Sequence, residues 1–162
     1  MKAFFAGSFD PLTTGHLNLI HRASMMFDEV VVAVMVNPLK KSSLTKEKRL
    51  EHLRKCTAHM GNVRIVEEEG LTVDAAKKHG CGVLVRGVRN GKDMDYEIEL
   101  EWYNRRLNSK IETVYLSTVP ELMHVSSTRV KEMASFHQSL KGLVPEIIRE
   151  EVESLLKPSA SS

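Results

Sequence analysis

Glycine, histidine, arginine and serine gather in three short stretches of this 162-residue chain. The first reads GSFDP at residues 7–11 and TTGH at 13–16, between an apolar run at 3–6 and a helix-like stretch at 17–27. A strand, a glycine turn and a helix start in this order form an anion site, because the first N–H groups of a helix lack partners and carry partial positive charge. His16 can donate a hydrogen bond to a phosphoryl oxygen as charge develops. This stretch predicts nucleotide chemistry.

The second stretch, RGVR at residues 86–89, follows a valine-rich segment. The planar fork of arginine makes two parallel hydrogen bonds to a phosphate. Side chains along a strand alternate between its two faces, and we expect a turn at Gly87 to redirect Arg86 and Arg89. The alternative is that both arginines form surface ion pairs with Asp93, Asp95 or Glu97. We favour phosphate binding.

The third stretch, VSST at residues 125–128, precedes a helical pattern. Its hydroxyl and N–H groups can bind a polyphosphate, although serines at this position also serve as ordinary N-caps. A short basic cluster, Lys40 and Lys41 with Lys46, Lys48 and Arg49 just beyond, has two interpretations as well. It is either a solvated loop and helix face or a phosphate clamp.

Strand-like and helix-like segments alternate along the chain, which predicts an α/β fold with a doubly wound, parallel five-stranded sheet and helices on both faces. Ligands bind such sheets beyond the carboxyl ends of the strands, so we expect the loops at 7–16, 37–41, 86–89 and 120–128 to form one pocket. The expected strands are 2–6, 29–37, 63–67, 81–86 and 111–117, and the expected helices are 14–27, 46–59, 72–79, 93–107, 126–136 and 145–156.

The length fits one domain, which we assign to residues 1–158 with a disordered tail at 159–162. A net charge of +2 without a long basic block does not favour nucleic acid as a partner. No apolar run is long enough to span a membrane. Two cysteines are too few for a disulfide scaffold or a zinc site, so we expect reduced thiols in a cytoplasmic protein.

The chain lacks an aspartate-rich metal cage, a Walker lysine motif and a Cys/His nucleophile pair. We therefore expect no metal site made by the protein itself, and any Mg²⁺ to arrive with the phosphates of a nucleotide. This pattern favours direct displacement at phosphorus, in which positioning and charge stabilisation supply the catalysis.

On these residues the chain resembles the phosphopantetheine adenylyltransferase family, within the nucleotidyltransferase superfamily, from Lys2 to about Leu156. The first stretch is similar to the superfamily's T/H-x-G-H motif, which cytidylyltransferases and nicotinate or nicotinamide mononucleotide adenylyltransferases share. Further matches narrow the resemblance: NPLKK at 37–41, VRGVR at 85–89, DYE at 95–97 and SSTRVKE at 126–132.

The resemblance implies a Rossmann-like nucleotidyltransferase fold. It also implies an enzyme of coenzyme A biosynthesis, which transfers the adenylyl group of ATP to 4′-phosphopantetheine and gives dephospho-coenzyme A and pyrophosphate. It further implies a Mg²⁺ requirement and a homohexamer.

Residue roles also follow from the resemblance. Ser8, His16, Lys40 and Arg89 would form the catalytic set, and the acceptor would be held by Ser8, Lys40, Thr72 and Arg86. ATP would contact Ser8, Phe9, His16, Gly87, Val88, Arg89, Glu97, Leu122, Met123, His124, Val125, Ser126, Ser127 and Thr128. Ser8 stands where threonine is common and keeps the hydroxyl, whereas residues 122–124 replace a commonly aromatic position.

Two other functions stay open at this point. One is an adenylyl- or cytidylyltransferase that acts on another acceptor phosphate. The other is a non-catalytic module that senses ATP or coenzyme A. The presence of His16, Lys40 and Arg89 together argues against such a module, because nucleotide binding alone does not need all three groups at the reacting phosphates.

Overall fold

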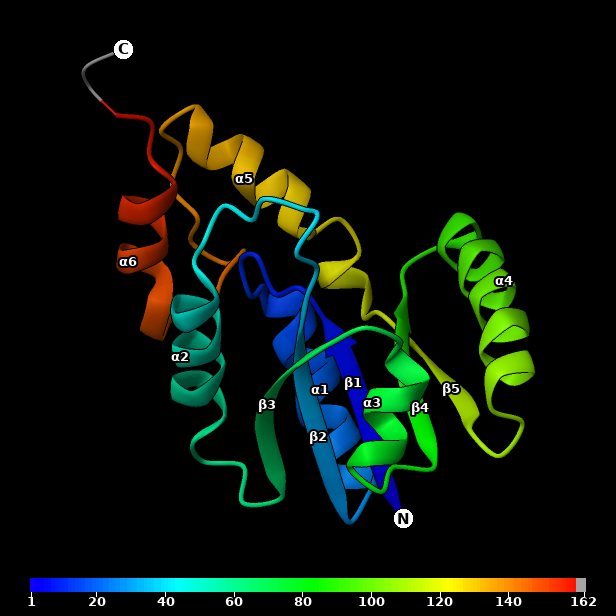
Figure 1. Ribbon diagram of the computed structural model, residues 1–162. Helices are drawn as coiled ribbons and strands as arrows, with labels where there is room; N and C mark the ends of the chain where they lie inside the picture. The colour runs from blue at the N-terminus through cyan, green and yellow to red at the C-terminus, as the bar shows by residue number, and fades with distance from the viewer. Residues whose placement is uncertain (160–162) are drawn as a thin grey trace.

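The computed structural model describes residues 1–159, and its centre is a parallel five-stranded sheet in the order β3-β2-β1-β4-β5 (Figure 1). The chain builds outward from β1 to β3 and then returns to the other side of β1 with β4, so the strand order reverses between β1 and β4. The predicted fold class is confirmed. Of the predicted tail, residues 160–162 lie outside the described residues. The strands are β1 (Lys2–Gly7), β2 (Glu29–Val36), β3 (Val63–Glu69), β4 (Val83–Val88) and β5 (Glu112–Ser117).

Strands β1 and β4 separate near their carboxyl ends. They are paired only at Ala3–Val83 and Phe4–Leu84, although both strands continue beyond these residues. By contrast, β1 pairs with β2 along its whole length. The separation opens a crevice at the point where the strand order reverses, which is where ligands bind in open α/β sheets.

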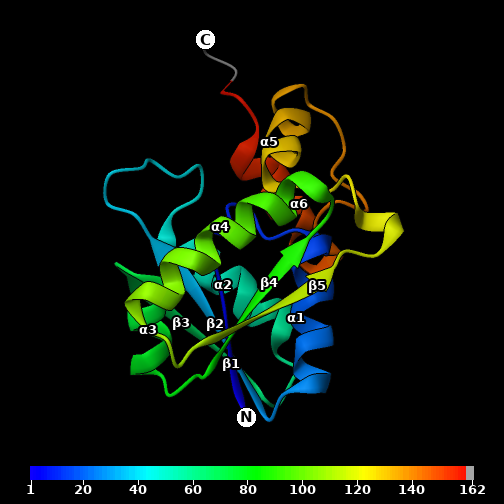
Figure 2. The same cartoon turned by 90° about the vertical axis from the view of Figure 1, so that its right-hand side faces the viewer.

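Helices cover both faces of the sheet (Figures 1 and 2). On one face the buried side chains of four helices pack with Phe5, Val32 and Val85. On the other face, α3 packs with Phe4 and Leu84. The first group is α1 (Thr14–Met26), α2 (Lys46–Thr57), α5 (Ser127–Ser135) and α6 (Glu146–Leu156); α3 is Thr72–Lys78, and a short 3₁₀ turn, η1 (Pro120–Leu122), was not predicted.

Polar contacts rather than apolar packing hold α4 (Gly91–Leu107) against the sheet. Its only buried residue is Glu97, which accepts two hydrogen bonds from Arg86 of β4. The hydroxyl of Tyr115 in β5 donates to Glu101 at 2.6 Å. The long α4 helix therefore presents its carboxylates to the sheet and leaves much of its apolar surface exposed.

The helix starts follow the capping residues of the sequence. Thr45 and Ser126 cap α2 and α5, and each accepts a hydrogen bond from the N–H three residues later. Gly80 follows α3 with a φ of 71°, the left-handed conformation that commonly ends a helix. Helix α4 begins two residues earlier than predicted, because the side chain of Asn90 accepts the N–H of Asp93 and caps the helix there.

Strand β4 extends further than predicted, and this corrects the role of Gly87. We expected the strand to end at residue 86 with a turn at Gly87, but Gly87 lies inside β4 and pairs with Leu116. A Cβ at Gly87 would lie 2.3 Å from Cδ1 of Leu19. The residue is glycine because α1 approaches the strand closely, and no turn redirects Arg86.

Neither a membrane span nor a reactive thiol is found in the described part of the chain. No helix there is both long and apolar enough to cross a bilayer. Cys56 and Cys81 are free and buried. Burial raises the pKa of the Cys56 thiol to about 11, so this side chain stays protonated and unreactive at neutral pH.

The contact between Gly87 and Leu19 gives a prediction on stability. We expect Gly87→Ala to lower the free energy of unfolding by about 2 kcal/mol, because Leu19 is buried and has to move for the new methyl group. Gly82→Ala is the matched control, since a Cβ at Gly82 meets no atom within 4 Å. Urea unfolding of both variants measures the difference. Equal stabilities would show that Leu19 repacks without cost.

Candidate active site

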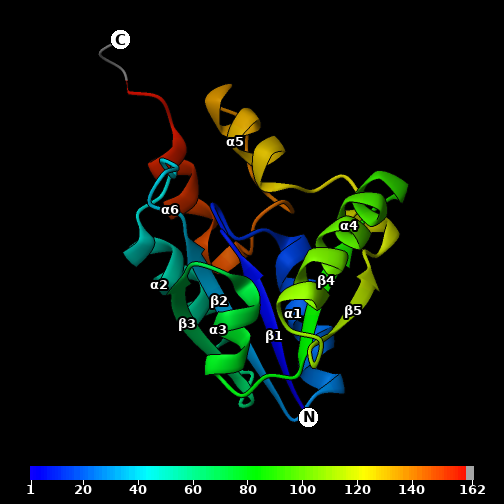
Figure 3. The same ribbon diagram turned by 45° about the vertical axis from the view of Figure 1, so that its right-hand side comes forward.

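A cavity of about 410 Å³ lies where β1 and β4 separate, at the carboxyl edge of the sheet. Its walls come from both strands, the turn after β1, the first turns of α1, and residues of α4 and α5. Figure 3 shows α5 beyond the end of the strands, with α4 and α1 on either side of β4. Of the four segments predicted to form one pocket, those at 7–16 and 86–89 line it, and so do residues 125–128 of the segment at 120–128, whereas the loop at 37–41 does not.

Most of the predicted site residues line this cavity, and a minority do not. Those from the loop at 37–41, the start of α3 and the η1 region are absent from its walls. The cavity-lining set is Ser8, Phe9, His16, Arg86, Gly87, Arg89, Glu97, Val125, Ser126, Ser127 and Thr128; outside it are Lys40, Thr72, Val88, Leu122, Met123 and His124.

Two helix N-termini offer unpaired donors to the cavity. In α1, Thr14 N–H donates to the carbonyl of Leu143 and His16 N–H to the hydroxyl of Thr13, which leaves Gly15 N–H without a partner among the described residues. In α5, the N–H groups of Ser127 and Thr128 have no partner within residues 1–159. Such donors, with the partial positive charge of each helix end, form an anion site.

A capping box fixes the orientation of the His16 ring. The N–H of Thr13 donates to Nδ1 of His16 at 3.1 Å, while His16 N–H donates to the Thr13 hydroxyl at 3.2 Å. The Phe9 ring packs edge-on against the imidazole, with 5.2 Å between the ring centroids. Because Nδ1 accepts a hydrogen bond, the proton of the neutral ring lies on Nε2. His16 is therefore a donor through Nε2.

The imidazole of His16 is neutral at physiological pH. Burial, and then the positive charge of Arg89, lower its pKa from 6.5 to about 4. A neutral Nε2–H group can strengthen its hydrogen bond to a phosphoryl oxygen as negative charge develops there.

Both arginines of the cavity already have carboxylate partners. Arg86 makes two 2.8 Å hydrogen bonds with Glu97 and a longer one, of 3.4 Å, with the carbonyl of Ala6. Arg89 is held by Asp93, through both its backbone N–H and its guanidinium, and these hydrogen bonds lower the pKa of Asp93. The ion-pair alternative thus describes both arginines, and both also line the cavity.

The serine hydroxyls at the start of α5 are used by the protein itself. Ser126 caps the helix by accepting the N–H of Arg129, and Ser127 donates to the carbonyl of Pro11 at 2.8 Å. The hydroxyl of Thr128 has no partner in the described chain. Ser127 therefore ties α5 to the turn after β1, and the backbone offers the free donors.

The loop that carries Lys40 rises from the sheet edge at a distance from α4 (Figures 1 and 2). Residues 37–41 are exposed, and the N–H of Lys40 closes a tight turn onto the carbonyl of Asn37. Thr72 begins α3, outside the walls of the cavity.

Sequence reasoning missed two buried charges next to the site. Asp10 is 6% exposed and accepts the N–H groups of Ser43 and Leu44. Arg49 is 5% exposed and donates to the carbonyl of Ser8. Asp10 lies within the GSFDP stretch, which was a signal available in the sequence. Arg49 belongs to the short basic cluster, for which a solvated helix face was one interpretation and a phosphate clamp the other, and nothing in the sequence indicated that it is buried.

Comparisons with known proteins agree with this geometry. The cytidylyltransferase-like family model matches residues 4–133. A phosphopantetheine adenylyltransferase of Streptococcus pneumoniae is 45% identical over 151 residues, which are 93% of each chain. The enzyme of the same name from Symbiobacterium thermophilum is 48% identical over 90% of each chain.

A solved structure shares the fold. A Vibrio parahaemolyticus protein assigned as a nicotinate-nucleotide adenylyltransferase matches 98% of this chain and 96% of its own, with a TM-score of 0.70 at 15% sequence identity. The sequence relatives, by contrast, keep close identity along nearly the whole chain. The protein described here therefore belongs to the cytidylyltransferase-like family and, within it, to the phosphopantetheine adenylyltransferases.

Proposed function

We propose that this protein transfers the adenylyl group of ATP to 4′-phosphopantetheine, giving dephospho-coenzyme A and pyrophosphate. The observation that carries the proposal is the meeting of the neutral His16 donor with two helix N-termini at one cavity. The names of the relatives that are 45–48% identical support the choice of acceptor.

The reaction is a direct in-line displacement without a covalent enzyme intermediate. A phosphate oxygen of the acceptor attacks the α-phosphorus of ATP, and the bond from that phosphorus to the bridging oxygen breaks. Pyrophosphate leaves with the electron pair. His16 donates from Nε2 to an oxygen of the transferred phosphoryl group, beside the hydroxyl of Ser8. The catalysis then consists of positioning and charge stabilisation.

The two substrates occupy different sides of the site. Arg89 and the N–H groups of Ser127 and Thr128 hold the ATP phosphates, with Gly87, Val88, Glu97 and residues 122–128 around the nucleotide. Ser8, Lys40, Thr72 and Arg86 hold the acceptor. Lys40 and Thr72 lie on the segments after β2 and β3, so the acceptor spans the sheet edge away from α4.

The residues present fit a Mg²⁺ ion that arrives with ATP. Asp93 and Glu97, the carboxylates of the cavity, are both engaged with arginines, and no group of three metal-ligating side chains occurs within residues 1–159. Phosphate oxygens of ATP would be the ligands of the Mg²⁺ ion that the protein does not supply. The ion would neutralise charge on the leaving pyrophosphate.

Turnover assays test this function directly. We expect pyrophosphate release from ATP and Mg²⁺ with 4′-phosphopantetheine, and none with nicotinamide mononucleotide or glycerol phosphate. Coupled detection of pyrophosphate measures all acceptors in one format. Turnover with another acceptor alone would select the rival transferase, and nucleotide binding without any turnover would select the sensor module.

His16 gives the sharpest test of the mechanism. His16→Ala should lower kcat by roughly 10²-fold and leave ATP binding largely intact, because one transition-state donor is lost. His16→Gln is the matched control, since glutamine can keep the capping box and offer an N–H donor. It should retain more activity than His16→Ala. A loss of ATP affinity at unchanged kcat would make His16 a binding residue.

The lowered pKa of His16 also fixes a pH dependence. A folded-state pKa of about 4 means that the ring protonates only well below 6.5, so kcat/KM should show no acid limb near pH 6.5 from this group. The unfolded chain takes up this proton first, so the contribution of His16 to stability falls as pH drops from 6.5 towards 4.

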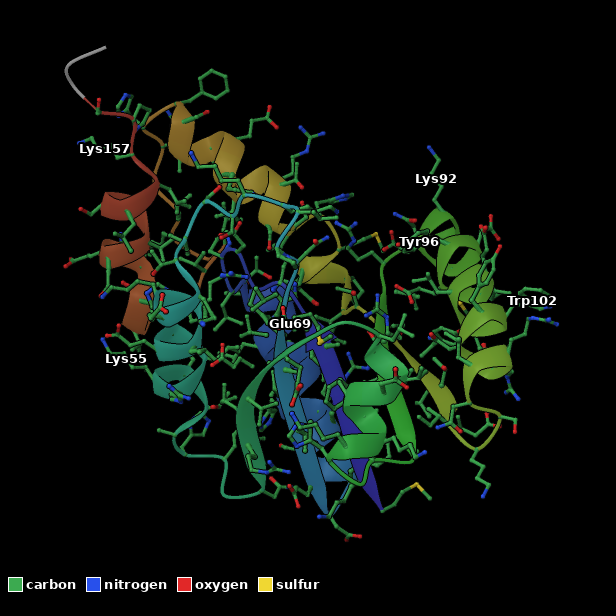
Figure 4. The ribbon with its side chains drawn as sticks, in the orientation of Figure 1. Lys55, Glu69, Lys92, Tyr96, Trp102 and Lys157 are labelled. Carbon is green, nitrogen blue, oxygen red and sulfur yellow. The ribbon has the colours of Figure 1, made fainter. Side chains whose placement is uncertain are left out.

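We include a homohexamer in the proposal, and the surface of α4 supports self-association. Ile98, Trp102, Tyr103 and Leu107 are each more than half exposed on this helix, and Trp102 points away from the sheet (Figure 4). Exposed apolar patches of this kind mark protein interfaces.

Substitution of Trp102 tests this surface. Trp102→Glu should shift the protein towards smaller assemblies in size-exclusion chromatography with light scattering, because a buried charge without a partner destabilises an interface. Ile147→Glu, at an even more exposed apolar position on α6, should not. The same mass for both variants would place the interface elsewhere.

The cytoplasm is the proposed location, and the free buried thiols are compatible with it.

A further inference from the structure

Arg49 is a buried cation without a carboxylate partner. Its side chain is 5% exposed in α2, and its Nε atom has no hydrogen-bond partner. No ion pair to Arg49 forms within residues 1–159. Burying an uncompensated charge is costly, and apolar residues of similar volume often stabilise a protein in its place. Buried charges without a partner therefore occur mainly where function requires them.

The guanidinium of Arg49 fixes a peptide group that borders the cavity. Nη1 donates to the carbonyl of Ser8 at 3.0 Å. The C=O and N–H of a trans peptide point in opposite directions, so this bond turns the N–H of Phe9 away from Arg49. Arg49 is not part of the cavity wall, whereas Ser8 and Phe9 both are. The N–H of Phe9 has no partner in the described chain, which leaves a donor for a phosphate.

The backbone at Phe9 needs this support. Its φ of 49° lies in the left-handed region, which bulky side chains rarely adopt and which costs of order 1–3 kcal/mol. Such a conformation persists only where the surroundings hold it. The Phe9 ring packs under Gly7 and against His16, and Arg49 holds the carbonyl on the other side of the same peptide.

Arg49 also links this turn to the loop after β2. Its Nη2 atom lies 3.4 Å from the hydroxyl of Ser42. From the opposite side, Asp10 accepts the N–H groups of Ser43 and Leu44, and Lys131 of α5 faces that carboxylate at 3.6 Å. The base of the loop that bears Lys40 is therefore fastened to the same turn that carries Ser8.

We propose that Arg49 is a positioning residue for phosphoryl transfer, which holds the Ser8–Phe9 peptide so that the N–H of Phe9 donates to a phosphate oxygen in the cavity. The proposal rests on the proposed function for its kinetic consequence. Its structural consequence, the orientation of one amide towards a bound phosphate, does not depend on which acceptor the enzyme uses.

Three variants separate positioning from charge and from stability. Arg49→Met keeps the volume and removes both hydrogen bonds and the charge. Arg49→Lys keeps the charge and loses the planar fork. Arg54→Met is the matched control, because Arg54 is an exposed arginine on the same helix. We expect the melting temperature of Arg49→Met to stay close to that of the wild type, because the removal of a buried unpaired charge offsets the loss of the hydrogen bond to Ser8.

Kinetics should split between binding and chemistry. We expect kcat to fall roughly 10²-fold in Arg49→Met and roughly 10-fold in Arg49→Lys, because a displaced N–H of Phe9 no longer stabilises the transition state fully. The KM for ATP should change by less than about threefold. Arg54→Met should match the wild type. A wild-type kcat in Arg49→Lys would show that the charge alone matters and overturn the proposal. Should Arg49→Met fail to fold, Arg49→Lys decides the question.

An amide signal tests the geometry without turnover. In ¹⁵N–¹H spectra, saturating pyrophosphate should shift the Phe9 amide of the wild type and of Arg54→Met, and this shift should be lost or reduced in Arg49→Met. An unchanged shift in Arg49→Met would overturn the proposal. If the wild type shows the shift but does not use phosphopantetheine, the proposed function fails and the role of Arg49 stands.

Discussion

The separation of β1 from β4 beyond Phe4 and Leu84 is the constraint on which the rest of the site depends. A parallel pair in the middle of a sheet normally continues its ladder, because unpaired buried backbone groups are costly. Here Leu19 approaches Gly87 and the Phe9 ring lies under Gly7, so apolar side chains fill the base of the gap. Arg86 donates to the carbonyl of Ala6 and takes the place of a ladder bond. The gap between β1 and β4 is therefore closed by apolar side chains at its base and lined by polar groups at the carboxyl edge of the sheet.

In the proposed function, the cavity attracts phosphate less through free arginines than through fixed neutral donors. Arg86 and Arg89 are each matched by a carboxylate, so their charges are largely compensated. The N–H groups of Gly15, Ser127 and Thr128 are uncompensated, and so is the Nε2–H of His16. Donors held in place before the reaction need no reorganisation as charge develops, and this makes them effective in catalysis. The first turns of α1 and α5, which carry these donors, are capped by Thr13 and Ser126.

The sequence predicted the order of elements, the sheet and three of the four site loops, because these depend on hydrophobic periodicity and on capping residues that act locally. It failed at Gly87, where a glycine that looked like a turn serves a contact with Leu19 from a distant helix. It also missed Arg49, whose burial depends on how α2 packs against the turn after β1 and not on its charged neighbours. The pairing of Arg86 with Glu97 was foreseen only as one alternative, since residue types alone do not decide between an ion pair and a free guanidinium.

The two halves of the site differ in how firmly the fold holds them. On the side that we propose for the nucleotide, the first turns of α1 and α5 are capped, and the bond from Ser127 to Pro11 ties α5 to the turn after β1, so the donors are preorganised. On the acceptor side, Lys40 lies on an exposed loop of which only the base, at residues 42–44, is tied down. The T/H-x-G-H motif that several transferases share belongs to the firm half. In the proposed function, acceptor choice falls to the loops after β2 and β3, which can vary in sequence without disturbing the phosphate donors, and such an arrangement would allow one fold to serve different acceptors.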